Sequence, residues 1–143
     1  MSYLWDSNIL RHYLDDHPLL LENLHKVPRR YILIPVVVAA EQFRGRIDGL
    51  LKAPPTQLER AQQSFRQTQD VLRRFELLYF DDQSLAVAAQ LNARFKTKKR
   101  YADVLIAAQA IAGHHTLITR NTADFRDLLP AQQLQNWIDE KIS

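Results

Sequence analysis

Four acidic residues stand where a carboxylate side chain could do chemistry. Asp6 ends a short apolar run that is typical of a strand, and Asp103 opens an apolar run that is typical of a helix. Glu41 lies between them, and Asp124 follows both. Carboxylates at strand ends and helix starts lie at the edge of an α/β sheet where such folds bind ligands. Oxygen-only ligands favour Mg²⁺ or Mn²⁺, and phosphodiester hydrolysis is the chemistry that such a cluster serves best.

Each acid alone also has a purely structural interpretation. Asp6 could cap a helix, Asp103 and Asp124 could be favourable charges in first turns, and Glu41 could be a solvated helix residue. Their joint placement favours a shared site, because these positions meet if the strand expected at 116–119 lies beside the strand expected at 2–5. Neutral polar residues near the same edge could hold the carboxylates or metal-bound water, or could simply form turns: Asn8, Thr119 and Asn121.

Strand-like and helix-like segments alternate along the chain. Strands are expected at 2–5, 31–35, 77–80, 116–119 and 134–138. Helices are expected at 8–14, from 18, at 36–46, at 58–75, from 84 and at 103–112, with a short turn at 123–128. Gly45 or Gly49 could end the third helix, Asp82 or Ser84 could cap the fifth, and Gly113 could cap the sixth. This alternation predicts a three-layer α/β fold with a parallel sheet.

The long helix expected at 58–75 has one apolar face, formed by residues spaced three and four apart. Packing against the core is the favoured interpretation of that face, and binding to a partner is the alternative. The basic segment Arg94, Lys96, Lys98, Lys99 and Arg100 also has two interpretations. It could be a solvated helix end or a surface that contacts phosphates, and its closeness to Asp103 supports the second.

Composition bounds the class of protein. With 143 residues, 46% hydrophobic and 24% charged, the chain is expected to form one domain over 1–143. It has no cysteine, which fits a reducing compartment, and we expect a cytoplasmic location without a signal peptide. The longest apolar stretch, 31–40, is too short to span a bilayer, so no membrane partner is expected. A net charge of +3 is compatible with nucleic acid.

Several other site types find no support in the sequence. The five histidines lack the helical spacing of a zinc site, and there is no G-x-S-x-G, P-loop or G-x-G-x-x-G pattern. A phosphatase with Asp6 as nucleophile is a rival, but that class commonly needs a second Asp where this chain has Asn8. A second rival is a non-enzymatic binding module that retains an inactive remnant of a catalytic site, and the complete set of four acids counts against it.

Five segments resemble the PIN-domain ribonucleases found as VapC-type toxins of bacterial toxin–antitoxin pairs. They are LWDSNIL at 4–10, AEQFRG at 40–45, ADVLIAAQA at 102–110, LITRNTADF at 117–125 and LQNW at 134–137. The resemblance implies a central five-stranded parallel sheet between helical layers. It makes Asp6, Glu41, Asp103 and Asp124 the catalytic metal cluster, with Asn121, Ser7 and Thr119 as polar support. It also implies Mg²⁺ or Mn²⁺, RNA cleavage, a homodimer and inhibition by a cognate antitoxin.

The sequence therefore predicts a Mg²⁺- or Mn²⁺-dependent endoribonuclease that is the toxin of a toxin–antitoxin pair. Two alternatives stay open: a PIN-type nuclease that processes RNA without being a toxin, and a catalytically inactive module that binds RNA or protein. The residues expected to contact RNA are basic and lie near Glu41 or before Asp103: Arg44, Arg46, Lys96, Lys98, Lys99 and Arg100.

Overall fold

Five short parallel strands form one sheet in the computed structural model, which describes residues 2–95 and 100–143. The strands are β1 (Tyr3–Trp5), β2 (Ile32–Pro35), β3 (Glu76–Leu78), β4 (Thr116–Ile118) and β5 (Leu134–Gln135). Their order is β3-β2-β1-β4-β5, and each neighbouring pair is parallel. In the β1–β4 pair Tyr3 lies opposite Thr116 and Trp5 lies opposite Ile118, so the fourth strand lies beside the first, which is the condition for the four acids to meet. The predicted α/β fold with a five-stranded parallel sheet is confirmed.

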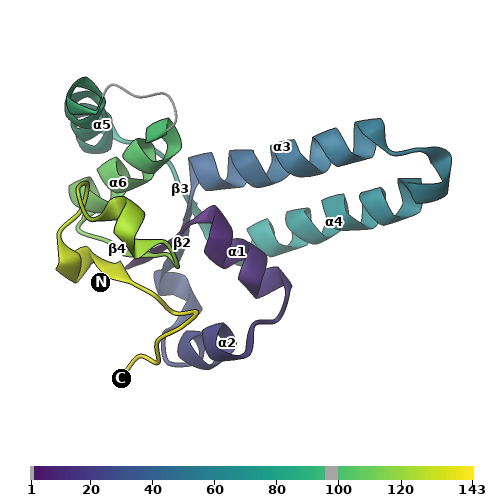
Figure 1. The fold of residues 1–143 in the computed structure, drawn as a ribbon, viewed down its shortest axis with the longest axis horizontal. Coiled ribbons are helices and arrows are strands. Elements are labelled where there is room, and N and C mark those ends of the chain that lie inside the picture. Colours follow the sequence, from purple (N-terminus) through teal and green to yellow (C-terminus); the bar gives the residue numbers. More distant parts are fainter. Residues whose placement is uncertain (1, 96–99) are drawn as a thin grey trace.

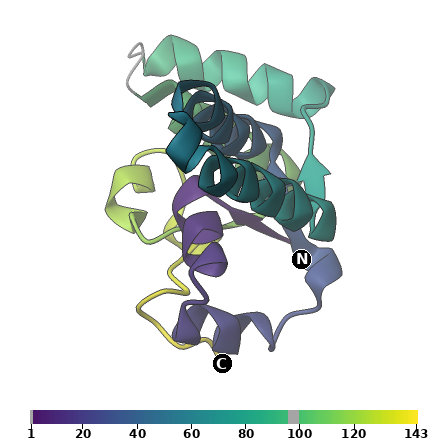
Figure 2. The same cartoon turned by 90° about the vertical axis from the view of Figure 1, so that its right-hand side faces the viewer.

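Helices pack around this sheet. They are α1 (Ser7–Leu14), α2 (Pro18–Leu24), α3 (Val36–Lys52), α4 (Leu58–Arg74), α5 (Asp82–Arg94) and α6 (Tyr101–Gly113). Short 3₁₀ turns are η1 (Arg29–Tyr31), η2 (Pro55–Gln57), η4 (Thr122–Phe125) and η5 (Ala131–Gln133). Figure 1 shows α5 and α6 on one side of the sheet and α2 on the other, with α3 and α4 projecting as a hairpin. Figure 2 shows the hairpin end-on. No helix in the described ranges is long and apolar enough to cross a membrane.

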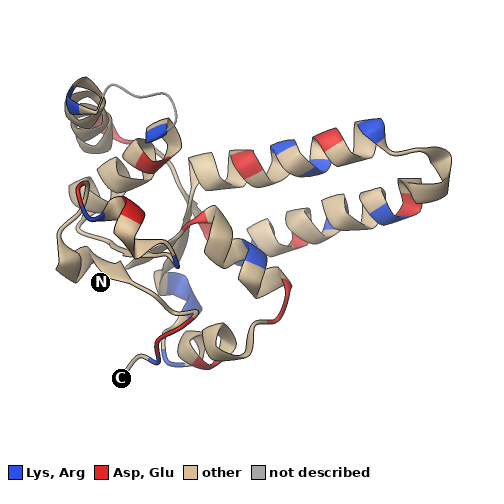
Figure 3. Cartoon of the chain, viewed as in Figure 1, with Lys and Arg blue, Asp and Glu red and all other residues tan. Residues whose placement is uncertain are grey.

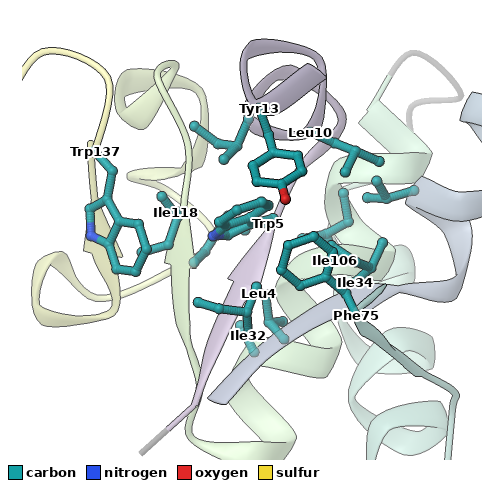
Figure 4. Packing of buried hydrophobic residues seen from close by; sticks show 14 of the residues in the cluster. Leu4, Trp5, Leu10, Tyr13, Ile32, Ile34, Phe75, Ile106, Ile118 and Trp137 are labelled. Carbon is teal, nitrogen blue, oxygen red and sulfur yellow. The ribbon is translucent and has the colours of Figure 1, made fainter. Parts of the chain in front are cut away.

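Trp5 lies at the centre of the hydrophobic core (Figure 4). Its ring is fully buried and packs against Phe75 and Tyr13, with ring centroids 4.9 and 5.5 Å apart. Trp137 meets the same ring edge-on at 6.4 Å. These aromatic contacts anchor the last residue of β1, and they fix the backbone position from which Asp6 leaves the sheet.

Helix α3 does not end at either of the glycines expected to end it. It runs through Gly45 and Gly49 to Lys52, six residues beyond the predicted end. Neither glycine has a positive φ, and a glycine inside a helix costs only about 1 kcal/mol. Packing against α4, which includes the Phe43–Phe65 ring contact at 6.0 Å, keeps the helix continuous.

Three other predicted boundaries are wrong in detail. The cap of α5 is Asp81, which accepts a hydrogen bond from the Ser84 amide at 2.8 Å and forms a capping box with its side chain. The left-handed residue after α6 is His114, with φ of 54°, rather than Gly113. The last strand has two residues because Asn136 Oδ1 accepts hydrogen bonds from the backbone amides of Ile138 and Asp139, and this turn ends β5.

The apolar face of α4 belongs only in part to the core. Val71 and Leu72, near its carboxyl end, are buried, whereas Leu58 at its beginning is 44% exposed. The first half of the helix pairs with the end of α3 and extends away from the sheet (Figure 1). Core packing therefore explains the second half of the predicted face, whereas the first half packs against α3 and leaves Leu58 exposed.

Candidate metal centre

Asp6 leaves the sheet at the carboxyl end of β1 and begins helix α1. Its Oδ1 accepts a hydrogen bond from the Ile9 amide at 3.0 Å, so the carboxylate caps the helix. The residue is only 8% exposed. Burial raises the pKa of Asp6 above its ordinary value, against hydrogen bonds from the Thr119 hydroxyl and the amides of Ile9 and Asn8 and together with the nearby charge of Asp103. A buried carboxylate with this environment favours a cationic partner.

Asp103 lies in the first turn of α6, half-buried at the same edge. Burial raises the pKa of Asp103, and the negative charges of Asp124 and Glu41 raise it further, whereas the Arg100 guanidinium lowers it. Asp103 is thus within electrostatic reach of the other three predicted acids, because it also raises the pKa of Asp6. Figure 3 shows acidic bands near the beginnings of α1, α3 and α6, around this edge of the sheet.

Glu41 and Asp124 complete the acidic set from opposite sides. Glu41 is exposed on α3, and its Oε2 accepts a hydrogen bond from the Ser7 hydroxyl at 3.1 Å. This contact ties the beginning of α1 to α3. Asp124 is exposed in η4, just after β4. The structure therefore brings the four acids to one edge from four separate elements, as β1–β4 pairing predicts.

The polar residues expected to support the acids occupy different positions. Thr119 is fully buried, donates a hydrogen bond to Asp6, and accepts one from the Asn121 amide at 3.0 Å. Asn8 Oδ1 is buried and has no hydrogen-bond partner within residues 2–95 and 100–143. The Asn121 side chain is exposed. Thr119 and Ser7 thus contact predicted metal ligands directly through their hydroxyls, whereas Asn8 contacts Asp6 through its backbone amide.

The donor atoms of these side chains suit a divalent cation, although their positions do not enclose a single ion. Four carboxylates supply only oxygen, which suits Mg²⁺ or Mn²⁺. In the described part of the chain, no three His, Cys, Asp or Glu side chains lie close enough together to hold one metal ion. A cation held between carboxylates would relieve their mutual repulsion.

A surface cleft of ≈ 490 Å³ lies beside Asp103 and Asp124, and its lining includes two residues that sequence reasoning missed. These are Arg126 and Asp127. Asp127 pairs with the guanidinium of Arg100 at 2.7 Å. The signal that could have identified Arg126 and Asp127 is their spacing, because they follow Asp124 within one helical turn.

The basic residues expected to contact RNA have different surroundings. Arg44 is exposed on α3, three residues after Glu41. Arg46 donates a hydrogen bond to Thr68 Oγ1 at 3.3 Å, which ties α3 to α4. Arg100 is bound to Asp127. Lys96, Lys98 and Lys99 lie outside the described residues.

Comparison with known proteins identifies the fold. The model of the PIN domain family matches residues 3–128. Among solved structures, VapBC-1 from nontypeable Haemophilus influenzae is 22% identical with a TM-score of 0.75, covering 96% of this chain and 98% of that chain. VapBC2 from Rickettsia felis, bound to a promoter DNA fragment, is 28% identical with a TM-score of 0.69, covering 96% and 99%. A toxin–antitoxin complex from Klebsiella pneumoniae is 21% identical with a TM-score of 0.69, covering 99% and 100%. No curated protein sequence matches significantly.

Proposed function

Because this chain belongs to the PIN-domain family, as its sequence predicted, we propose that it is a Mg²⁺- or Mn²⁺-dependent endoribonuclease and the toxin of a toxin–antitoxin pair. One observation carries the proposal. Asp103 interacts electrostatically with Asp6, Glu41 and Asp124, which come from three other elements of the fold. Acids that repel one another at the carboxyl edge of a parallel sheet are stabilised by a divalent cation.

The four acids Asp6, Glu41, Asp103 and Asp124 would hold the cation. When bound, it polarises a scissile phosphate, activates a water molecule and stabilises the leaving oxygen. The protein orients the ligands: the Ser7 hydroxyl holds Glu41, and the Thr119 hydroxyl holds Asp6. Asn8 and Asn121 are polar support beside these two ligands.

The RNA backbone would be held by cations around the cleft. Arg44 is exposed close to Glu41 along α3, and Arg126 lines the cleft with Asp103 and Asp124. Arg46 and Arg100, together with Lys96, Lys98 and Lys99, remain part of this proposal. Contacts of this kind recognise phosphate without sequence preference and weaken as salt rises.

A fluorogenic RNA cleavage assay tests the activity. The parent should cleave with Mn²⁺ or Mg²⁺ and stop when EDTA is added. Asp6→Asn should lose more than roughly 100-fold in rate, because a ligand contributes more than the second-shell partners whose loss costs 10–100-fold. Asp48→Asn, an exposed acid on α3, is the matched control and should cleave like the parent. If Asp6→Asn cleaved RNA as fast as the parent, the assignment of the active site would be wrong.

An antitoxin partner is the second part of the proposal. The solved neighbours include VapBC complexes and a toxin–antitoxin complex. In this chain the α3–α4 hairpin projects from the sheet and exposes apolar side chains: Leu51 is 79% exposed and Ile47 is 43% exposed. We expect a cognate antitoxin to bind this arm and to cover the acidic cleft. Cleavage that no neighbouring gene product suppresses would favour an RNA-processing nuclease instead.

A further inference from the structure

One guanidinium group joins two segments that carry predicted metal ligands. Arg100 Nη1 and Nη2 donate to the two carboxylate oxygens of Asp127 at 2.7 and 2.8 Å. Nη2 also donates to the backbone carbonyl oxygen of Asp124 at 2.7 Å. Arg100 is the N-cap residue of α6, three residues before Asp103, and Asp127 is three residues after Asp124. The contact therefore spans the beginning of α6 and the turn that follows β4.

The geometry of this contact limits how the two segments can move. A bidentate Arg–carboxylate pair fixes both distance and orientation, which a lysine cannot do. The Arg100 guanidinium also lies over the Phe95 ring, with its central carbon 5.6 Å from the ring centroid. Bound to two oxygens of Asp127 and one of Asp124, the guanidinium already has anionic and polar partners within the protein.

We propose that Arg100 and Asp127 form a clamp that fixes the segment carrying Asp103 relative to the segment carrying Asp124, and that metal binding depends on this fixed arrangement. This inference rests on the proposed metal-dependent function and adds Arg100 and Asp127 as positioning residues. It gives Arg100 a structural role in addition to the RNA contact proposed above. Because the pair is 28% and 53% exposed, it contributes little to global stability, and its effect falls on the local arrangement of the acids.

Mn²⁺ binding in the absence of RNA can be measured by calorimetry or by electron paramagnetic resonance. It distinguishes positioning of the acids by Arg100 from a purely electrostatic effect of the Arg100 charge. Removing a cation beside an acidic site strengthens the attraction for Mn²⁺ if only charge matters, so Arg100→Gln would then bind Mn²⁺ more tightly. A clamp predicts the opposite sign, a loss of roughly tenfold in Mn²⁺ affinity, as for other residues that orient metal ligands. Arg100→Lys keeps the charge without the bidentate geometry and should also bind more weakly.

The partner residue and a matched pair complete the experiment. Asp127→Asn should weaken Mn²⁺ binding to a similar extent, and the double variant should be no weaker than either single one, because both changes break one contact. Asp139→Asn breaks a second exposed bidentate pair, with Arg120 at 3.1 Å, and should bind Mn²⁺ like the parent. Circular dichroism should show the same fold for all variants.

Each result decides the proposal. Unchanged or tighter Mn²⁺ binding by Arg100→Gln in a parent that binds Mn²⁺ overturns the clamp and leaves the proposed function intact. Weaker RNA binding by Arg100→Gln with unchanged Mn²⁺ affinity also overturns it, in favour of a phosphate contact. A parent that binds no Mn²⁺ overturns the proposed metal centre and the clamp together.

Discussion

Replacing Asp103 with Asn should stabilise the metal-free protein and remove most of its response to Mn²⁺. Burial raises the pKa of Asp103, and the charges of Asp124 and Glu41 act in the same direction. A folded-state pKa above the unfolded value means that the fold loses stability as pH rises through the interval between the two. At neutral pH Asp103 is ionised, so the parent carries the full destabilisation that ionisation causes. An Asn at the same position does not ionise and therefore avoids this destabilisation.

The size of the effect follows from the charges around Asp103. Two like charges about 8 Å apart repel by about 2 kcal/mol at an effective dielectric near 20. Asp103 feels the like charges of Asp124 and Glu41 and the opposite charge of Arg100, at separations that need not equal that distance, and solvent screens groups that are half-exposed. The net gain of Asp103→Asn should therefore be about 1 kcal/mol, or about 3 °C in Tm for a domain of this size. Mn²⁺ at 100 times its Kd should add about 2.7 kcal/mol to the parent by mass action.

Differential scanning calorimetry at pH 7.5, with EDTA and with millimolar Mn²⁺, measures both effects. The parent should gain roughly 8 °C with Mn²⁺, by the same conversion. The Asp103→Asn variant should have a higher Tm than the parent in EDTA, and Mn²⁺ should raise its Tm only slightly. Well below pH ~3.9, the ordinary pKa of a free Asp, this carboxyl is protonated in both the folded and the unfolded state, so the difference between the metal-free proteins should disappear. A shared metal site would be refuted if millimolar Mn²⁺ left the Tm of the parent unchanged at neutral pH. It would also be refuted if Asp103→Asn lowered the Tm as a core substitution does.

Three further predictions concern partners, RNA and the hairpin. Light scattering should show a homodimer at micromolar concentration and a tight complex with an adjacently encoded antitoxin; a monomer that binds no such product contradicts this. RNA binding should weaken with salt, and Arg126→Gln should reduce the slope of log affinity against log salt by about 0.7; binding that salt leaves unchanged would exclude phosphate contacts. Gly49→Ala should raise the free energy of unfolding in urea by about 0.5–1 kcal/mol, because its added Cβ meets nothing within 4 Å inside a helix; a decrease would show that the glycine is required.

The position of the acids could be predicted because it depends on rules that act over short stretches of sequence. Apolar runs that end in a carboxylate mark the carboxyl ends of strands, and a parallel sheet brings those ends to one edge. Asp6 and Asp124 both follow strands, and the β1–β4 pairing brings those strands together. The identity of the acidic edge therefore followed from the order of elements rather than from any single motif.

The ends of helices and the contacts between distant residues could not be predicted in this way. Gly49 favours a helix end by intrinsic propensity, but packing of α3 on α4 outweighs that preference. Arg100 and Asp127 are 27 residues apart and meet only because β4 places η4 beside the start of α6. In the sequence, Arg100 is one of several cations in a basic segment, and its ion-pair partner is visible only in the folded chain.

Asp6 shows why local structural roles and a shared functional role are compatible in these acids. Its carboxylate caps α1 through the Ile9 amide while lying within the field of Asp103. The cap fixes one oxygen toward the helix, and burial keeps the side chain from turning away to solvent. Asn caps a helix about as well as Asp, so Asp6→Asn removes the charge and retains the cap. Loss of metal binding in that variant would therefore report on the site itself, whereas Asp6→Ala would also cost about 1 kcal/mol of helix stability.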